Sequence, residues 1–246
     1  MKKIILLVMI FPGLQQTASA QDTTKPKKNT ILFNVTNPII FGSSFIIGYE
    51  RVLNPHQSFS VNLGTTSFPG SDNTDTDSVK VNNVKNKSGL NVSADFRFYL
   101  SKENKYAAPR GVYIGPYYSY NNFARDQTWM LKSTNGGAPL QTKTELNLNI
   151  HTIGFEMGYQ FVFNNWLALN AILIGPGISS YSLKATLDGN LSESDREKLL
   201  EAINDALTEK FPNWGQLVDD GEFQSKGSTN TTTWGYRYMI QIGFRF

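Results

Sequence analysis

Few residues in this chain could carry acid–base or nucleophilic chemistry. It has two histidines and no cysteine, so catalysis by these residue types would depend on His56 or His151. His56 lies in the polar stretch NPHQ, which we interpret as a solvated turn, and His151 lies in NIHTIGFE. Neither context offers a matched nucleophile and an orienting carboxylate. We therefore predict no catalytic residue and no enzymatic activity.

Ligands for metals, cofactors and nucleic acids are equally sparse. The acidic stretch GSDNTDTD at residues 70–77 lacks the glycine at position 6 and the glutamate at position 12 of a calcium-binding EF-hand loop. Zinc-ligand spacings and phosphate-binding glycine loops are absent from the sequence. Without Lys2 and Lys3 the formal net charge falls from +3 to +1, which does not favour polyanionic partners. We predict no metal, no cofactor and no nucleic-acid partner.

Charged residues occur instead at alternate positions within otherwise apolar segments. In GYERVL, ADFRFYL, GFEMGYQFVF and WGYRYMIQIGFRF, bulky apolar residues alternate with small or charged ones. Neighbouring residues of a β-strand point to opposite faces, so the charges share one face. A confined charge needs an opposite partner, because an unpaired buried charge is costly. The predicted charge network consists of Glu50, Asp95, Arg97, Glu156, Arg237 and Arg245.

The positions of these charges along their segments predict two ion pairs. Glu156 and Arg237 lie eight and nine residues from the same ends of their segments, and Glu50 and Arg97 each lie four residues from theirs. We expect Glu156 to pair with Arg237, and Glu50 with Arg97. Strand stagger would shift either pairing.

Eight alternating segments must position these charges. They span residues 30–38, 43–53, 57–67, 88–100, 111–122, 147–163, 166–183 and 232–246. Several are longer than the usual soluble strand of about 5–6 residues and reach the roughly 9–11 residues of a tilted membrane strand. The connections alternate between short turns such as Asn164–Asn165 and long polar runs. One rim of short turns and one of long loops is typical of bacterial outer-membrane barrels.

The composition of the two faces predicts which one is inside. The polar face carries glycine, serine, asparagine and threonine, and no lysine lies within the core of an alternating segment. Small residues suit a narrow interior, whereas a water-facing sheet would carry lysine and glutamate. The bulky face, with Trp166 and Trp234 near strand ends, suits lipid with an interfacial aromatic girdle. We predict an all-β fold: an eight-stranded antiparallel transmembrane β-barrel over residues 30–246.

The N-terminal residues predict export. Lys2 and Lys3 precede a short apolar run, and Ala18-Ser19-Ala20 forms a small-x-small cleavage site. We assign residues 1–20 to a signal peptide and 21–29 to a polar leader. Together with the barrel pattern, this places the protein in the outer membrane of a Gram-negative bacterium, with outer-membrane lipid as its surroundings.

Residues 191–211 depart from the β pattern. Ser192 suits an N-cap with Asp195 three residues on, and Pro212 suits a stop. An apolar stripe recurs at helical spacing, formed by Leu199, Leu200, Ile203, Leu207 and Phe211. We predict one helical insertion in the last long loop. Its stripe either packs against neighbouring loops or the barrel mouth, or binds a surface protein partner.

The segments GYERVL, ADFRFYL, GVYIGPYYSY, GFEMGYQFVF and IQIGFRF, in this order, resemble a family of small outer-membrane β-barrels of uncharacterised function common in Bacteroidota. They are more distantly similar to the transmembrane domain of OmpA-type proteins. The resemblance implies that Tyr238, Ile242, Phe244 and Phe246 form a signal read by the barrel-assembly machinery.

Two classes of function follow from this fold, and a third is less favoured. Eight-stranded barrels have just enough interior for side chains to fill, which favours a structural or interaction protein that presents surface loops. The alternative is transport of a small solute or a hydrophobic ligand through the barrel. A lipid-modifying barrel enzyme is the least favoured.

Overall fold

The computed structural model describes residues 27–41, 43–66, 79–131, 140–188, 191–210 and 227–246. The predicted signal peptide, most of the leader and the acidic stretch at 70–77 lie outside these residues.

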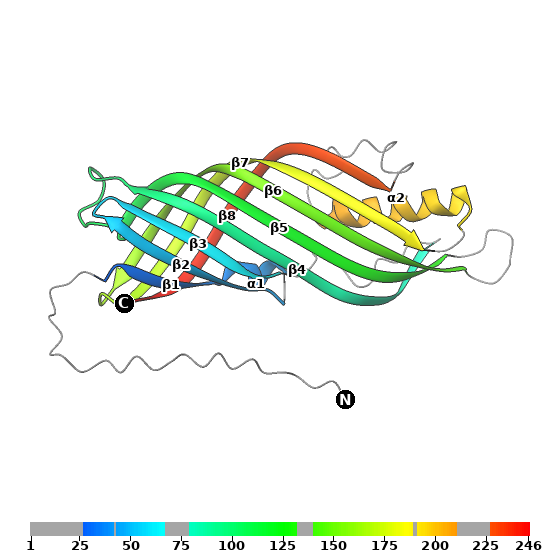
Figure 1. Cartoon of the computed structure of the whole chain (residues 1–246), viewed down its shortest axis with the longest axis horizontal. Coiled ribbons are helices and arrows are strands. Elements are labelled where there is room, and N and C mark those ends of the chain that lie inside the picture. Colours follow the sequence, from blue (N-terminus) through cyan, green and yellow to red (C-terminus); the bar gives the residue numbers. More distant parts are fainter. Residues whose placement is uncertain (1–26, 42, 67–78, 132–139, 189–190, 211–226) are drawn as a thin grey trace, which may run out of the picture.

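Eight antiparallel strands form a closed barrel in which each strand pairs with its neighbours in sequence and β8 closes against β1. Figure 1 shows the strands running obliquely around the long axis. This confirms the predicted fold class. The strands are β1 (Asn29–Asn34), β2 (Phe45–Asn54), β3 (Gln57–Thr65), β4 (Val79–Tyr99), β5 (Gly111–Leu131), β6 (Leu140–Phe163), β7 (Leu167–Asp188) and β8 (Ser228–Arg245).

The short turns lie at one end of the barrel, together with the C-terminus (Figure 1). Asn164 and Asn165 connect β6 to β7 with φ values of 46° and 61°. Positive φ at both central residues is the requirement of a type I′ hairpin turn, and asparagine tolerates it better than most residues. The dipeptide therefore sets the register of this hairpin.

The outer wall at this end of the barrel is apolar. Every strand contributes exposed aromatic or aliphatic side chains, among them Phe33, Ile47, Phe59, Val92, Ile114, Phe155, Ile178 and Ile240. Trp166 and Trp234 lie exposed near the two limits of this belt. A closed barrel with an apolar exterior satisfies its backbone hydrogen bonds without water, as a lipid environment requires. Among the described residues, no helix is long and apolar enough to cross a membrane.

Five of the strands are longer than the sequence predicts. β4 to β8 contain 18–24 residues, whereas β1 to β3 contain 6–10. The polar runs that we predicted to be loops, up to Lys87 and Glu145, are partly strand. The barrel wall therefore continues beyond the apolar belt on the side of β4 to β8.

The strand extensions were missed because the two faces exchange polarity along the chain. In β6 the inward residues change from polar Thr152 to buried Ile150 and Leu148, while outside Ile153 is followed by His151 and Asn149. The alternation persists, but its apolar phase moves from the lipid side to the interior. This exchange marks the end of the lipid-facing belt and the start of a water-facing wall with an apolar inside.

The first connection contains a helix that the sequence analysis did not predict. Helix α1 (Thr36–Phe41) replaces the end of the segment that we expected to remain extended to residue 38. The side chain of Asn34 accepts a hydrogen bond from the Asn37 amide at 3.0 Å. Pro38 is compatible with the first turn, where its missing N–H leaves no helical bond unmade. In Figure 1, α1 lies near the middle of the long axis, where it connects the ends of β1 and β2 that are remote from the short turns.

The predicted insertion forms helix α2 (Glu193–Lys210) at the end opposite the short turns (Figure 1). The hydroxyl of Ser192 accepts a hydrogen bond from the Asp195 amide at 3.2 Å, which is the predicted capping contact. Leu199, Leu200 and Ile203 are fully buried in a cluster with inward residues of β5, β6 and β7. That cluster includes Phe123, Trp129, Leu146, Leu148, Ile150, Leu183 and Ala185.

Candidate functional site in the barrel lumen

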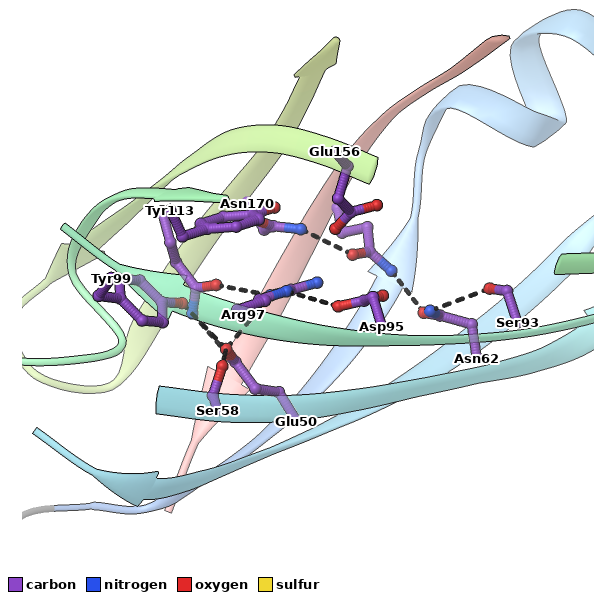
Figure 2. Close-up of polar contacts among 12 residues, drawn as sticks. Glu50, Ser58, Asn62, Ser93, Asp95, Arg97, Tyr99, Tyr113, Glu156 and Asn170 are labelled. Carbon is purple, nitrogen blue, oxygen red and sulfur yellow. Dashed lines mark hydrogen bonds and ion pairs between the residues drawn. The ribbon is translucent and has the colours of Figure 1, made fainter. Parts of the chain in front are cut away.

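The interior within the apolar belt is filled by a network of charged and polar side chains, with Arg97 of β4 at its centre (Figure 2). Its Nε donates to Asp95 Oδ2 at 2.7 Å, and its Nη1 donates to Glu50 Oε1 at 3.2 Å and to Gln160 Oε1 at 3.1 Å. The Arg97 guanidinium also lies 4.8 Å from the centre of the Tyr113 ring. Arg97 and Glu50 are both 0% exposed.

Glu50 is satisfied from several strands. Its Oε1 accepts hydrogen bonds from Ser58 at 2.7 Å and Tyr99 at 3.1 Å, and its Oε2 accepts one from Gln160 at 2.8 Å. Charge-assisted hydrogen bonds of this kind are stronger than neutral ones. The predicted proximity of Glu50 and Arg97 is present in the structure, and β2, β3, β4 and β6 are joined across the lumen at this level.

The second predicted pair, Glu156 and Arg237, lies in the lumen farther from the short turns, the direction that we call up. Arg237 Nη1 lies 3.1 Å from Glu156 Oε2, and Nη2 lies 3.5 Å from Asp95 Oδ1. The guanidinium lies 5.0 Å from the centre of the Tyr117 ring. Asp95 therefore contacts both arginines, and the two pairs that we predicted separately form one network. Its three carboxylates and two guanidiniums carry a formal charge of −1.

Arg245 differs from the other five predicted members. It is buried near the short-turn end, where Nη2 donates to the Lys27 carbonyl at 2.6 Å and Nη1 donates to Asn165 Oδ1 at 3.2 Å. Its described hydrogen bonds all go to neutral oxygens, so Arg245 is buried as predicted but forms no ion pair with a described carboxylate. The reason is height: the last inward position of β8 lies at the rim, below Glu50.

Neutral side chains that were not among the predicted site residues complete the network. Tyr113 donates to Asn170, which donates to Gln241, which in turn donates to Asn62, at 2.8–2.9 Å. Asn62 donates to Ser93 at 3.3 Å. The available signal was their position at alternate residues on the charged face. The charges alone therefore predict the ion pairs but not the amides between them.

Two tyrosines bond backbone carbonyls at irregular positions of β7. Between β6 and β7 the pairing is interrupted from Gly154–Gly177 to Met157–Ile174, and Pro176, which cannot donate to a ladder, lies in the gap. From inside, the Tyr117 hydroxyl donates to the carbonyl of Gly175 in this gap at 2.8 Å. Between β7 and β8 the register shifts between Ile172 and Gly175, and there the Tyr236 hydroxyl donates from outside to the Leu173 carbonyl at 3.0 Å.

Above the network the lumen widens into a cavity of about 230 Å³. Small polar residues surround its lower part, namely Asn91, Ser93, Ser119, Thr152 and Ser179, and Arg237 lines it. Phe123, Ile150 and Met239 supply apolar surface, and Thr36, Asn37 and Ile40 of α1 border it. We refer to this space as the upper chamber. The upper chamber is not predictable from the sequence pattern, because it depends on where β1 to β3 end.

The histidines do not form a catalytic arrangement with each other. His56 lies in the turn between β2 and β3. His151 lies on the outer face, where Nδ1 is 2.8 Å from the Tyr118 hydroxyl and the ring is 4.7 Å from that of Tyr120. Within the described residues, no group of three or more His, Cys, Asp or Glu side chains could hold a metal ion.

The proposed assembly residues lie on the outer face. Tyr238, Ile242, Phe244 and Phe246 are all about half exposed and form one stripe along β8 and its end. The stripe of α2 has an intramolecular environment at Leu199, Leu200 and Ile203, which favours packing over a free surface. The side chain of Leu207 and residue Phe211 lie outside the described part of the chain.

Comparison with known proteins yields distant structural likenesses. The crystal structure of CarO from Acinetobacter baumannii is 12% identical, with a TM-score of 0.40, covering 92% of this chain and all of that one. A major outer membrane protein from Thermus thermophilus is 10% identical, with a TM-score of 0.35, covering 90% of this chain and all of that one. No protein-family model matches the chain, and no curated protein sequence matches it significantly.

Proposed function

We propose that this protein is a non-conducting barrel of the bacterial outer membrane that acts as a structural or interaction protein. The observation that carries this proposal is Arg97, which is fully buried and hydrogen-bonded to Asp95, Glu50 and Gln160 across the lumen. A hydrated ion could pass only if these charge-assisted contacts separated. Breaking a buried pair costs about 3–5 kcal/mol, so a steady open pore is disfavoured.

The outer-membrane location rests on the apolar belt and on the predicted signal peptide at residues 1–20. The similarity to Bacteroidota-type and OmpA-type barrels, and the reading of Tyr238, Ile242, Phe244 and Phe246 by the assembly machinery, belong to the same proposal. Its presented surface comprises the outer ends of β4 to β8 and the exposed side of α2. A surface partner would contact that side, because Leu199, Leu200 and Ile203 are already buried.

Conductance across a planar bilayer tests the closed lumen. We expect the wild-type barrel to show no steady conductance, and Arg97→Ala to introduce channel openings because it removes the central cation. Arg51→Ala is the matched control, because Arg51 neighbours Glu50 but lies exposed on the outer face. This variant should show no steady conductance. Steady wild-type conductance close to that of a general porin would refute the proposal and favour solute transport.

A further inference from the structure

We propose that the upper chamber is a binding site for one small neutral amphiphile that comes from the outer leaflet of the membrane. The proposal goes beyond the closed-barrel function and does not depend on whether the barrel conducts. It rests on the opening of the chamber, the polarity of its two ends and its size.

The chamber opens sideways because β1 is short. The last pair between β1 and β8 is Asn34–Gln241, and above it Ile240 is held by the Val35 amide and the Thr36 hydroxyl. Beyond that point, β8 has no strand partner on this side among the described residues. Within the described residues, the edge of β4 has no β3 partner beyond the contact of Thr66 with Gly89.

The residues that line the chamber show that the cavity extends around the unpaired edge of β8. Tyr236 and Tyr238 point outward, whereas Arg237 and Met239 point inward, and all four line the same space. Since neighbouring residues of a strand lie on opposite faces, a cavity bordered by all four reaches both sides of the wall. Its outer side is bordered by exposed Ile40 of α1 and by exposed Tyr238, within the apolar belt. The opening therefore faces lipid rather than the aqueous phase.

The inner end of the chamber selects a neutral polar group. The Arg237 guanidinium disfavours a cationic head, and the network beneath it carries a formal charge of −1, which disfavours an anionic one. Asn91 donates from Nδ2 to Asn121 at 2.6 Å, while its Oδ1 accepts no hydrogen bond from the described residues. A buried acceptor without a partner favours a ligand that donates a hydrogen bond. A hydroxyl group meets these conditions.

The remaining surface and the volume define the rest of the ligand. Phe123 and Ile150 give the chamber an apolar side farther from the short turns than the polar residues, and Met239 adds apolar surface beside Arg237. A protein cavity of about 150 Å³ holds benzene, so in proportion the 230 Å³ of this chamber suits roughly nine non-hydrogen atoms. 1-Octanol has this size, one hydroxyl and an alkyl tail, and n-octane is the matched probe without the head.

The test uses the full barrel in nanodiscs of deuterated lipid, with a perdeuterated protein and protonated 1-octanol. We expect NMR cross-peaks between octanol methylenes and the amide groups of Asn91, Ser93 and Ser119, and much weaker ones with n-octane. Asn91→Leu should weaken octanol binding about three- to tenfold, as loss of one hydrogen bond does, and leave octane unchanged.

Two variants separate the chamber from the outer wall. Ser179 lines the chamber and is buried, whereas the next residue, Ser180, is exposed outside. Ser179→Phe should abolish the cross-peaks and Ser180→Phe should retain them. If Ser179→Phe does not fold, the octanol–octane comparison on the wild type decides. Equal signals for both probes, cross-peaks that survive Ser179→Phe, or cross-peaks confined to outer residues such as Ile153 and Trp234 would overturn the proposal.

Discussion

The formal charge of the lumen network predicts that Glu156 and Arg237, which form one ion pair, contribute unequally to the free energy of unfolding. Arg237 contacts both Glu156 and Asp95, while Asp95 also accepts from Arg97. Replacing Glu156 by glutamine leaves two carboxylates and two guanidiniums, so the network becomes neutral and Arg237 retains Asp95. Replacing Arg237 by glutamine leaves three carboxylates and one guanidinium, so the charge becomes −2 and Glu156 loses its 3.1 Å partner.

The magnitudes follow from burial. Glu156 is 2% exposed, and an uncompensated buried charge costs about 3–5 kcal/mol. We expect Arg237→Gln to lower the free energy of unfolding by this amount. For Glu156→Gln we expect a loss of less than about 1 kcal/mol, because the glutamine keeps the shape and a hydrogen-bonding oxygen while the excess charge disappears.

Urea unfolding of the barrel in lipid vesicles, followed by tryptophan fluorescence, measures both variants. Arg51→Gln, an arginine replaced on the exposed outer face, controls for loss of a guanidinium as such and should change stability little. For a variant that folds poorly, the fraction that runs as the heat-modifiable folded form on gels replaces the titration. Equal losses for the two variants, or a larger loss for Glu156→Gln, would refute the charge balance that we derive from the structure.

Three further predictions concern packing and assembly. Leu200→Ala should lower the free energy of unfolding by about 2–5 kcal/mol, because Leu200 is fully buried. Glu201 is exposed on the same helix, so Glu201→Ala should have little effect in the same urea assay. Equal effects of the two variants would mean that α2 does not pack as described. Gly235→Ala places a Cβ 2.0 Å from the Ser179 hydroxyl, so we expect lower folding yield on gels and recovery in the double variant with Ser179→Gly; no recovery would show that another contact is responsible. Deletion of Phe246 should reduce the outer-membrane yield in cells if the end of β8 is the assembly signal, while Phe163→Ala, another exposed aromatic at the short-turn end, should not; a normal yield after the deletion would make Phe246 one more lipid-facing residue.

The chain's alternation determined the barrel and the orientation of its wall. Within the lipid belt, a period of two and the difference between bulky and small residues assign each side chain to lipid or lumen, because a strand has only two faces. That placed Glu50, Arg97, Glu156 and Arg237 inside and allowed their pairing to be predicted from height alone. Helix α2 was also predictable from the sequence, because its N-cap residue and its apolar stripe lie within one short stretch of the chain.

Tertiary structure decided what depends on several strands at once. Arg245 follows the same alternation as Arg237, yet only the closed sheet shows that its hydrogen bonds go to the Lys27 carbonyl and to Asn165 and not to a carboxylate. The strand extensions were hidden because the apolar phase changes face at His151–Thr152, and only the burial of α2 against Leu148 and Leu183 explains an apolar interior there. The upper chamber exists because β1 ends at Asn34 while β8 continues to Ser228. No local pattern contains that difference, which arises only when the barrel closes and sets the two ends side by side.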